Sequence, residues 1–315
     1  MRVKWSLLIV LFILLVGLLL RLYMLHDKPI SLDEDDSILF SSYAMQGTIL
    51  HPPTVDAHPP LFYYLVGLLL LFDSLYFVRI VFALLGVLGI YLTYVLTKKI
   101  FSERLAIITI FLLSVAPMHI AYSQHLRHYI VMSLFFLLST YLLYRYIFLR
   151  DTKISYFLPI LYVFSFYFDV NVTVFYMLAH FVTVIYFSYG KKVTHLFRRY
   201  LYGLIAASLV CALWLPFLFK QVQYYLVEGR LANPTFDIFS LPYPFYKFAV
   251  MTDLSTTLTH FPYLLLLFPL LSFLMLRGCY KLYQESPDKS IFLFLNFFTQ
   301  IFVVALLWPF FKIYS

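Results

Sequence analysis

The chain has 315 residues, of which 63% are hydrophobic and only 12% are charged. Globular proteins contain about 45–50% apolar and about 25% charged residues, so this composition indicates an integral membrane protein. The net charge of +8 does not indicate a nucleic-acid partner, because the basic residues form short clusters between apolar runs and no basic domain. The partners expected from composition are therefore membrane lipids and not nucleic acid.

The first apolar run follows Arg2 and Lys4 and is not followed by a small-residue cleavage site, so it predicts a transmembrane helix and not a signal peptide. Apolar runs of about 20 residues predict spans. We expect an all-α, multi-pass protein with about nine transmembrane helices, at 5–25, 79–97, 104–121, 129–148, 154–169, 171–189, 200–219, 259–277 and 290–310.

One further apolar run, residues 60–72, is short for a crossing and predicts a juxtamembrane helix. If this run stays on the outer surface and the N-terminus is inside, all five inside segments carry Lys or Arg, as the positive-inside rule requires. Residues 26–78 then form an extracytoplasmic loop with two juxtamembrane helices, and residues 220–258 form a second such loop. The whole chain, residues 1–315, is then one transmembrane domain.

The acidic run Asp33-Glu34-Asp35-Asp36 lies in the first of these loops. Ser31 and Glu34 have the spacing of a capping box, which predicts a helix that begins after Ser31, reaches Met45 and stops at Gly47. The first turn of a helix favours ionised carboxylates. An ionised Asp33 could accept a proton from a hydroxyl nucleophile. The alternative is that these carboxylates only cap and solvate the helix.

Metal binding is the other chemistry open to this loop. Carboxylate oxygens suit hard divalent cations, and the metal candidates are Asp35, Asp36 and His58, beside Asp33 and Glu34. His58 precedes two prolines that favour a helix start. His58 could instead be a hydrogen-bond partner of an acceptor or an interfacial residue.

Two further groups of polar residues are expected at the outer ends of spans. The octet 122–129 separates two apolar runs, and a polar stretch there needs a wet cavity or a turn. Arg127 is its fixed cation and could bind a phosphate, while Arg79 is a second candidate contact. Asp169 and Asn171 lie at a tight turn, where turn chemistry explains them as well as a cavity does.

The order of these blocks resembles the C-type (GT-C) glycosyltransferases, in particular the protein O-mannosyltransferase and aminoarabinose-transferase-like branch (glycosyltransferase family 39-like). The resemblance covers roughly residues 5–225. It rests on Leu32-Asp33-Glu34, His58-Pro59-Pro60-Leu61-Phe62-Tyr63-Tyr64, Arg79, Tyr122-Ser123-Gln124-x-x-Arg127-x-Tyr129 and Trp214-Leu215-Pro216. It implies a GT-C-like helical bundle.

The resemblance also implies an enzyme that moves a hexosyl or pentosyl group from a polyprenyl- or dolichyl-phosphate carrier to a lipid, glycan or protein acceptor. Asp33 would be the catalytic base of an inverting displacement, and Glu34 its catalytic neighbour. The site would face the extracytoplasmic side, of the plasma (inner) membrane if the source is prokaryotic. No cofactor is certain, and a divalent metal ion is the one candidate. The expected substrate-binding residues are His58, Arg127, Tyr122, Gln124, Tyr129 and Arg79.

The chain departs from the family pattern in two places. Relatives carry a Thr-His-Tyr-like block where this chain has Tyr167-Phe168-Asp169-Val170-Asn171. Relatives also usually continue through further spans, so we expect the C-terminal part of the family to be absent here. Two other functions stay open: a transporter or flippase for polyprenyl-linked sugars, and a truncated, non-catalytic GT-C-like membrane protein.

Overall fold

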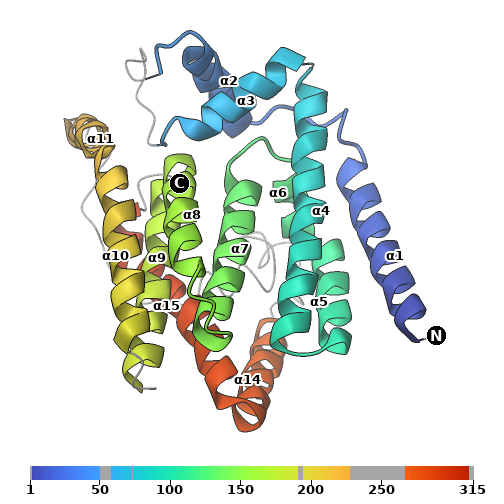
Figure 1. The fold of residues 1–315 in the computed structure, drawn as a ribbon. Helices are drawn as coiled ribbons and strands as arrows, with labels where there is room; N and C mark the ends of the chain where they lie inside the picture. The colour runs from blue at the N-terminus through green and yellow to red at the C-terminus, as the bar shows by residue number, and fades with distance from the viewer. Residues whose placement is uncertain (1, 50–57, 73, 191–193, 228–266, 312–315) are drawn as a thin grey trace. The chain divides into compact units, whose positions relative to one another are not determined.

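The structure is a computed structural model, and it describes the chain except residues 1, 50–57, 73, 191–193, 228–266 and 312–315 (Figure 1). The described residues form helices joined by short connections, with no strand among them. The first seven helices are α1 (Arg2–Leu22), α2 (Leu32–Met45), α3 (Leu61–Phe72), α4 (Leu75–Ile100), α5 (Glu103–Val115), α6 (Pro117–Ser123) and α7 (Tyr129–Phe148). They are followed by α8 (Ile154–Phe168), α9 (Val170–Gly190), α10 (Thr194–Ala212), α11 (Leu215–Val227), α14 (Leu267–Glu285) and α15 (Pro287–Phe311).

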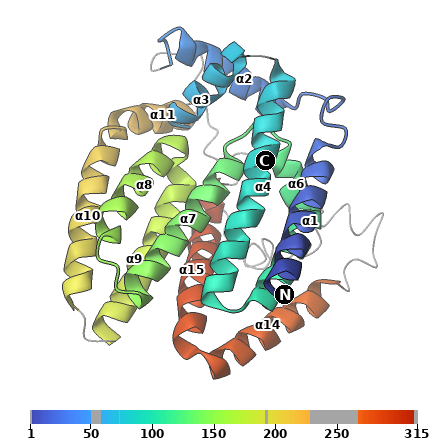
Figure 2. The same cartoon turned by 45° about the vertical axis from the view of Figure 1, so that its right-hand side comes forward.

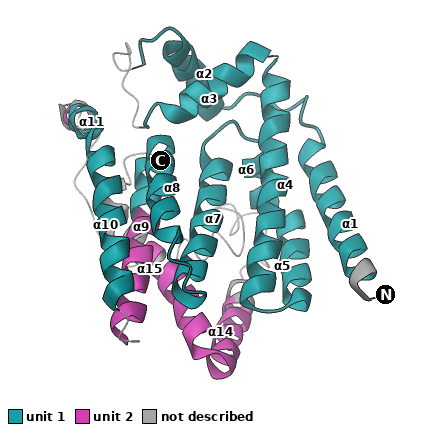
Figure 3. Ribbon diagram, viewed as in Figure 1, with its two compact units in different colours: residues 1–174, 194–221 teal, residues 175–193, 222–315 magenta. Residues whose placement is uncertain are grey.

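The chain divides into two compact units (Figure 3). Residues 1–174 and 194–221 form unit 1, and residues 175–193 and 222–315 form unit 2. In unit 2, α14 packs against α15. All the predicted site residues belong to unit 1. The prediction of one transmembrane domain over residues 1–315 stays a prediction.

In unit 1, α4 is the central helix: it packs against α1, α5 and α7, and α8 packs against α7 and α10. A core of aliphatic side chains joins the first of these helices, with Val10, Ile13, Ile90 and Ile110 all buried. The outward face is equally apolar. Trp5 and Phe12 of α1 are 65% and 66% exposed, which suits contact with lipid and would be costly in water.

Within the described part of the chain, four helices are long and apolar enough to cross a membrane: α1 (from Trp5), α4, α7 and α9. The α5–α6 pair makes a fifth candidate if it is counted as one span, and α8 is shorter. These findings support an integral membrane protein, but the expected number of about nine spans is not confirmed. The predicted span 290–310 lies within α15, and the predicted span 259–277 lies partly outside the described residues.

Two predicted spans are each divided between two helices in the structure. The predicted span 200–219 covers two helices, because α10 ends at Ala212 and α11 begins at Leu215, just before Pro216. The predicted outer loop 220–258 therefore begins inside α11, and its remainder from residue 228 lies outside the described residues. The predicted span 104–121 is broken between Val115 and Pro117, where α5 and α6 meet at a bend of 64°.

The break follows from Pro117, which has no N–H to donate to the carbonyl of Leu113. The N–H of Ala116 donates to this carbonyl at 3.3 Å, and Arg21, at the end of α1, adds a second donor. Its side chain is wholly buried, and no carboxylate pairs with it among the described residues. The guanidinium donates to Leu113 O (3.5 Å), Ser114 O (3.0 Å), Gly17 O (2.7 Å), Ser123 Oγ (3.2 Å) and His119 Nδ1 (2.7 Å).

Helices α2 and α3 lie across one end of the unit 1 bundle (Figures 1 and 2). The predicted capping box is confirmed: Glu34 N–H donates to Ser31 Oγ, and Ser31 N–H donates to the Glu34 carboxylate. The helix ends at Met45, and Gly47 has φ +74°, as the C-terminal stop requires. The predicted short helix after His58 is also confirmed as α3. Gly67 of α3 lets the two helices approach, since a Cβ there would lie 2.6 Å from Cγ of Met45.

The two ends of the unit 1 bundle differ in charge. The end of α4 at Lys98 and Lys99, the start of α5 at Arg104, and the α7–α8 connection at Arg150 carry basic residues. The other end of α4 contacts α3 and, through Arg79, α2; there Arg79 and Arg127 pair with Glu34 and Asp33, while Asp35 and Asp36 are exposed. This separation agrees with the sense of the positive-inside rule. The side of the membrane stays a prediction.

Candidate active site

Four segments of unit 1 meet at the α2–α3 end of the bundle: the first turn of α2, His58, the loop 124–128 between α6 and α7, and Asp169 between α8 and α9. Hydrogen bonds and ion pairs join these segments across 41 to 111 residues of sequence. The structure therefore brings most of the predicted site residues together, but it gives them unequal surroundings.

Asp33 and Arg127 form the most open of these pairs. Nη2 of Arg127 donates to Oδ1 of Asp33 at 3.1 Å. The Asp33 side chain is 51% exposed, whereas that of Arg127 is only 10% exposed. Burial would lower the pKa of Arg127, but the charge of Asp33 and its hydrogen bond raise that pKa overall. The Nε–H of Arg127 is buried and has no hydrogen-bond partner among the described residues. The pair thus joins an accessible carboxylate to a cation with an unused donor.

Glu34, the neighbour of Asp33, has very different surroundings. Its side chain is wholly buried and accepts hydrogen bonds from Arg79 Nε (3.2 Å), Arg79 Nη2 (2.9 Å) and the backbone N–H of Leu126 (3.0 Å). Burial by itself raises the pKa of Glu34, but the hydrogen bonds from Arg79, Leu126 and Ser31 outweigh it, and the pKa lies below its ordinary value. Glu34 therefore ties α2 to α4 and to the 124–128 loop.

The guanidinium of Arg79 is fully used inside the protein. Besides the fork on Glu34, its Nη1 donates to the backbone oxygens of Leu25 (3.4 Å) and Lys28 (2.7 Å), and its Nη2 donates to that of Pro29 (3.2 Å). A guanidinium has five N–H groups, and all five are engaged here. Arg79 fixes the connection between α1 and α2 and has no donor left for a substrate phosphate.

The remaining residues of the 122–129 block divide into anchors and exposed rings. Gln124 Nε2 donates to the backbone oxygens of Arg21 and Tyr23, both at 3.1 Å, so this amide anchors the loop to the end of α1. His125 Nε2 lies 2.8 Å from Ser31 Oγ, and burial lowers the pKa of His125. Tyr122 and Tyr129 are both more than one-third exposed, and their ring centroids lie 5.0 Å apart.

The other two carboxylates of the acidic run are solvent-exposed. Asp35 and Asp36 point away from the packed face of α2 that buries Glu34, Ser37 and Phe40. Neither forms an ion pair with another described residue. Of the metal candidates from the sequence, only His58 joins a group with metal-ligand geometry in the described part of the chain.

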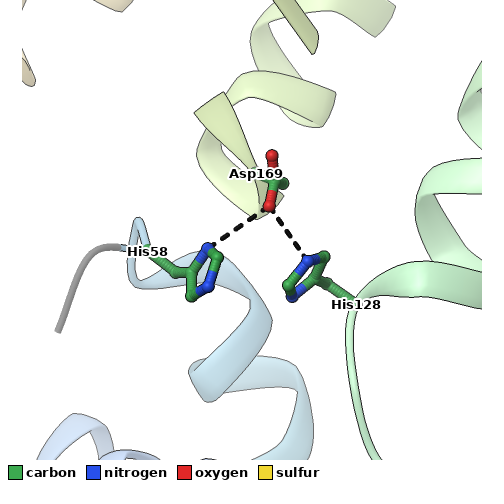
Figure 4. Close-up of side chains that lie close together, drawn as sticks. All are labelled: His58, His128 and Asp169. Atoms are coloured by element: carbon green, nitrogen blue, oxygen red, sulfur yellow. Dashed lines mark ion pairs between the residues drawn. The ribbon is translucent and has the colours of Figure 1, made fainter. Parts of the chain in front are cut away.

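That group consists of His58, His128 and Asp169 (Figure 4). Oδ2 of Asp169 lies 3.3 Å from His58 Nδ1 and 3.0 Å from His128 Nε2. The other oxygen, Oδ1, accepts the backbone N–H of Val172 at 2.8 Å and so caps the start of α9. Burial opposes ionisation of Asp169, but the hydrogen bonds from His128 and His58 hold its pKa well below the usual range. Burial also lowers the pKa of His128, which favours its neutral form.

Sequence reasoning did not assign His128, and for Asp169 it left open whether the residue faces a cavity or serves only the turn. The available signal was their position: each is an ionisable residue immediately before a long apolar helix. Residues 167–171 stand where the family resemblance implies a Thr-His-Tyr-like block. Asp169, within this segment, contacts His58 and His128.

Comparison with known proteins gives one family. The sequence pattern of the dolichyl-phosphate-mannose-protein mannosyltransferase family matches residues 57–218, which is just over half of the chain. The match includes His58, Arg79, Arg127 and Asp169, but it begins after Asp33. No curated protein and no solved structure matches the chain. The chain therefore belongs to the dolichyl-phosphate-mannose-protein mannosyltransferase family and is a membrane glycosyltransferase of the GT-C type.

Proposed function

We propose that this protein transfers a sugar from a polyprenyl- or dolichyl-phosphate carrier to an acceptor on the extracytoplasmic face of the membrane. The family description names dolichyl-phosphate mannose and a protein, so mannose is the first donor sugar to test and a protein hydroxyl the first acceptor. The α2–α3 end of unit 1 is the proposed site.

The contact between Asp33 and Arg127 carries this proposal. The Asp33 carboxylate is half exposed on the first turn of α2, where the helix dipole favours negative charge, so an acceptor can reach it. A buried guanidinium with an unused N–H is suited to an incoming phosphate oxygen. The two side chains thus provide a base and an anion-binding guanidinium, joined by the 3.1 Å hydrogen bond from Arg127 Nη2 to Asp33 Oδ1.

The proposed reaction is a single displacement. Asp33 accepts the proton of the acceptor hydroxyl while that oxygen attacks the anomeric carbon of the sugar. The bond from the anomeric carbon to the phosphate oxygen breaks, and the lipid phosphate leaves with both electrons of that bond. Arg127 stabilises the charge that develops on the leaving oxygen. One displacement inverts the anomeric centre.

The surroundings of the other predicted residues refine their proposed roles. Glu34 and Arg79 hold the site together instead of contacting substrate, because each is buried in a fully used ion pair. Gln124 positions the 124–128 loop through the carbonyls at the end of α1. Tyr122 and Tyr129, with exposed rings, remain proposed substrate contacts.

Asp33 is tested by replacing it with Asn in the full chain reconstituted into vesicles. The assay follows transfer of labelled mannose from dolichyl- or polyprenyl-phosphate to a serine- and threonine-containing peptide. Loss of a general base predicts a fall in rate of roughly 10²–10⁴-fold. Asp35→Asn is the matched control, because Asp35 is an exposed carboxylate on the same turn, and it should keep the wild-type rate. A D33N variant as active as the wild type would remove Asp33 from the mechanism.

The same vesicles separate a transferase from a flippase. A transferase releases the lipid phosphate and glycosylates the peptide without net movement of the lipid between leaflets. Lipid movement without transfer would instead identify a transporter.

The proposed sidedness is tested with single cysteines at positions 35 and 99, in a background where Cys211 and Cys279 are Ser. An impermeant thiol reagent added outside cells should label position 35 and not position 99; the reverse pattern would invert the topology.

A further inference from the structure

The cluster of His58, His128 and Asp169 has no task in the displacement described above. Its three side chains come from three separate places in unit 1: the residues before α3, the start of α7 and the junction of α8 with α9. Two imidazoles from different segments therefore contact the same carboxylate oxygen.

The distances fit a shared metal ion. A tetrahedral Zn²⁺ with bonds of about 2.0–2.1 Å holds its ligand atoms about 3.3 Å from one another. Oδ2 of Asp169 lies 3.3 Å from Nδ1 of His58 and 3.0 Å from Nε2 of His128, and all three potential ligand atoms lie within 4.8 Å of one another. Small side-chain rotations would therefore suffice to place an ion among them.

The charge balance also favours a cation. Asp169 is only 2% exposed, and a buried carboxylate is costly unless its charge is compensated. Among the ion pairs of the described residues, the partners of Asp169 are the two histidines, and neither Lys nor Arg contacts it. Both partners are therefore imidazoles, and no side chain with a permanent positive charge pairs with this carboxylate among the described residues. A divalent ion in the cluster would compensate its charge.

The ligands are held in place by their surroundings. Oδ1 of Asp169 accepts the N–H of Val172, which fixes the carboxylate and leaves Oδ2 directed at the histidines. The ring of Phe62 packs edge-on against that of His128, with centroids 5.9 Å apart. The buried Nδ1 of His128 has no hydrogen-bond partner among the described residues, so the polar contact of this ring is the one from Nε2 to Asp169. The His58 side chain is 20% exposed and leaves an access path for an ion and a water ligand.

We propose that His58 Nδ1, His128 Nε2 and Asp169 Oδ2 bind one divalent cation of the Zn²⁺ class, with water in the remaining position. Two imidazole nitrogens and one carboxylate suit Zn²⁺ or Co²⁺, whereas Mg²⁺ and Ca²⁺ require mainly oxygen ligands. The site is distinct from Asp33, and the proposal does not depend on the transferase mechanism.

The test measures binding directly, on the full chain purified without a histidine tag. Zn²⁺ titrated into the metal-free protein should bind at one ion per chain and raise the thermal unfolding temperature, while Mg²⁺ should do neither. His58→Ala and Asp169→Asn should each weaken Zn²⁺ binding at least tenfold. His26→Ala is the matched control, because His26 lies 3.3 Å from Asp27 in an exposed His–Asp pair outside the cluster, and it should bind Zn²⁺ like the wild type.

Two results would overturn the proposal: a wild-type protein that binds no Zn²⁺, or H58A and D169N variants that bind it as the wild type does. His58 is the most exposed of the three ligands, so its removal disturbs folding least. If Asp169→Asn does not fold, the visible spectrum of the Co²⁺-loaded wild type decides. Bands of nitrogen-ligated Co²⁺ would support the site, and the spectrum of hydrated Co²⁺ would contradict it.

Discussion

Arg127 and His128 are adjacent in the chain, yet they contact different carboxylates: Arg127 donates to Asp33 at 3.1 Å, and His128 lies 3.0 Å from Asp169. The short loop before α7 therefore joins two chemically different centres at the same end of unit 1. One is an accessible carboxylate–guanidinium pair, and the other is a buried carboxylate–imidazole cluster. Damage to this loop should affect both centres, so informative variants must separate them.

The Glu34–Arg79 pair should behave as a structural element. Glu34→Met leaves Arg79 buried without its partner, and loss of one member of a buried ion pair costs about 3–5 kcal/mol. Replacing both residues by Met should cost less than the sum of the single changes, because no unpaired charge remains. The free energy of unfolding of the detergent-solubilised protein is measured for the wild type, both single variants and the double variant. Asp36→Ala is the control: Asp36 is exposed, so this change should alter the free energy of unfolding by almost nothing. Additive single changes would show that the pair is not coupled.

Acid should weaken the same pair. The folded pKa of Glu34 lies below its ordinary value of 4.5, so the unfolded chain binds the proton more readily. The contribution of Glu34 is therefore complete above pH 4.5 and is lost as the pH falls through the folded pKa. The stability advantage of the wild type over Glu34→Gln should shrink on acidification below pH 4.5, measured as the difference in unfolding temperature. An advantage that grows on acidification would contradict the sign of this shift.

Arg21 should be indispensable for the bend at Pro117. Arg21→Ala removes the side-chain donor to the Ser114 carbonyl and the second donor to the Leu113 carbonyl, and hydrogen bonds from a charged group contribute about 1.5–3 kcal/mol each. The unfolding temperature should fall markedly, and Arg21→Lys should restore only part of the loss, since an ammonium has three donors for five acceptors. Lys99→Ala, an exposed basic residue at the opposite end of α4, should change little. An R21A protein as stable as the wild type would contradict this role.

Local rules predicted the local structure of the site. The capping box at Ser31, the stop at Gly47 and the short helix α3 follow from spacing within a few residues, and the structure contains all three. Pro117 is a comparable local signal for the break between α5 and α6. The break was not predicted, because the apolar run 104–121 continues across it. The different burial of Asp33 and Glu34 within the acidic run could not be predicted from local sequence. Asp33 and Glu34 are adjacent carboxylates, and only packing against Arg79 and the 124–128 loop makes one of them buried.

Arg127 is proposed to act on the leaving phosphate and not merely to orient Asp33. Arg127→Ala should lower the transfer rate roughly 10²–10³-fold, the usual cost of one charge-stabilising donor. Arg127→Lys should recover little, because Lys lacks the fork and the Nε–H that is unused in the wild type. The decisive experiment compares the D33N variant with the D33N/R127A double variant. The vesicle assay with labelled donor gives the transfer rate and the KM of each. If Arg127 binds phosphate, the double variant is slower than D33N alone and has a higher KM for the lipid donor. Equal rates and an unchanged KM would reduce Arg127 to a positioning residue for Asp33.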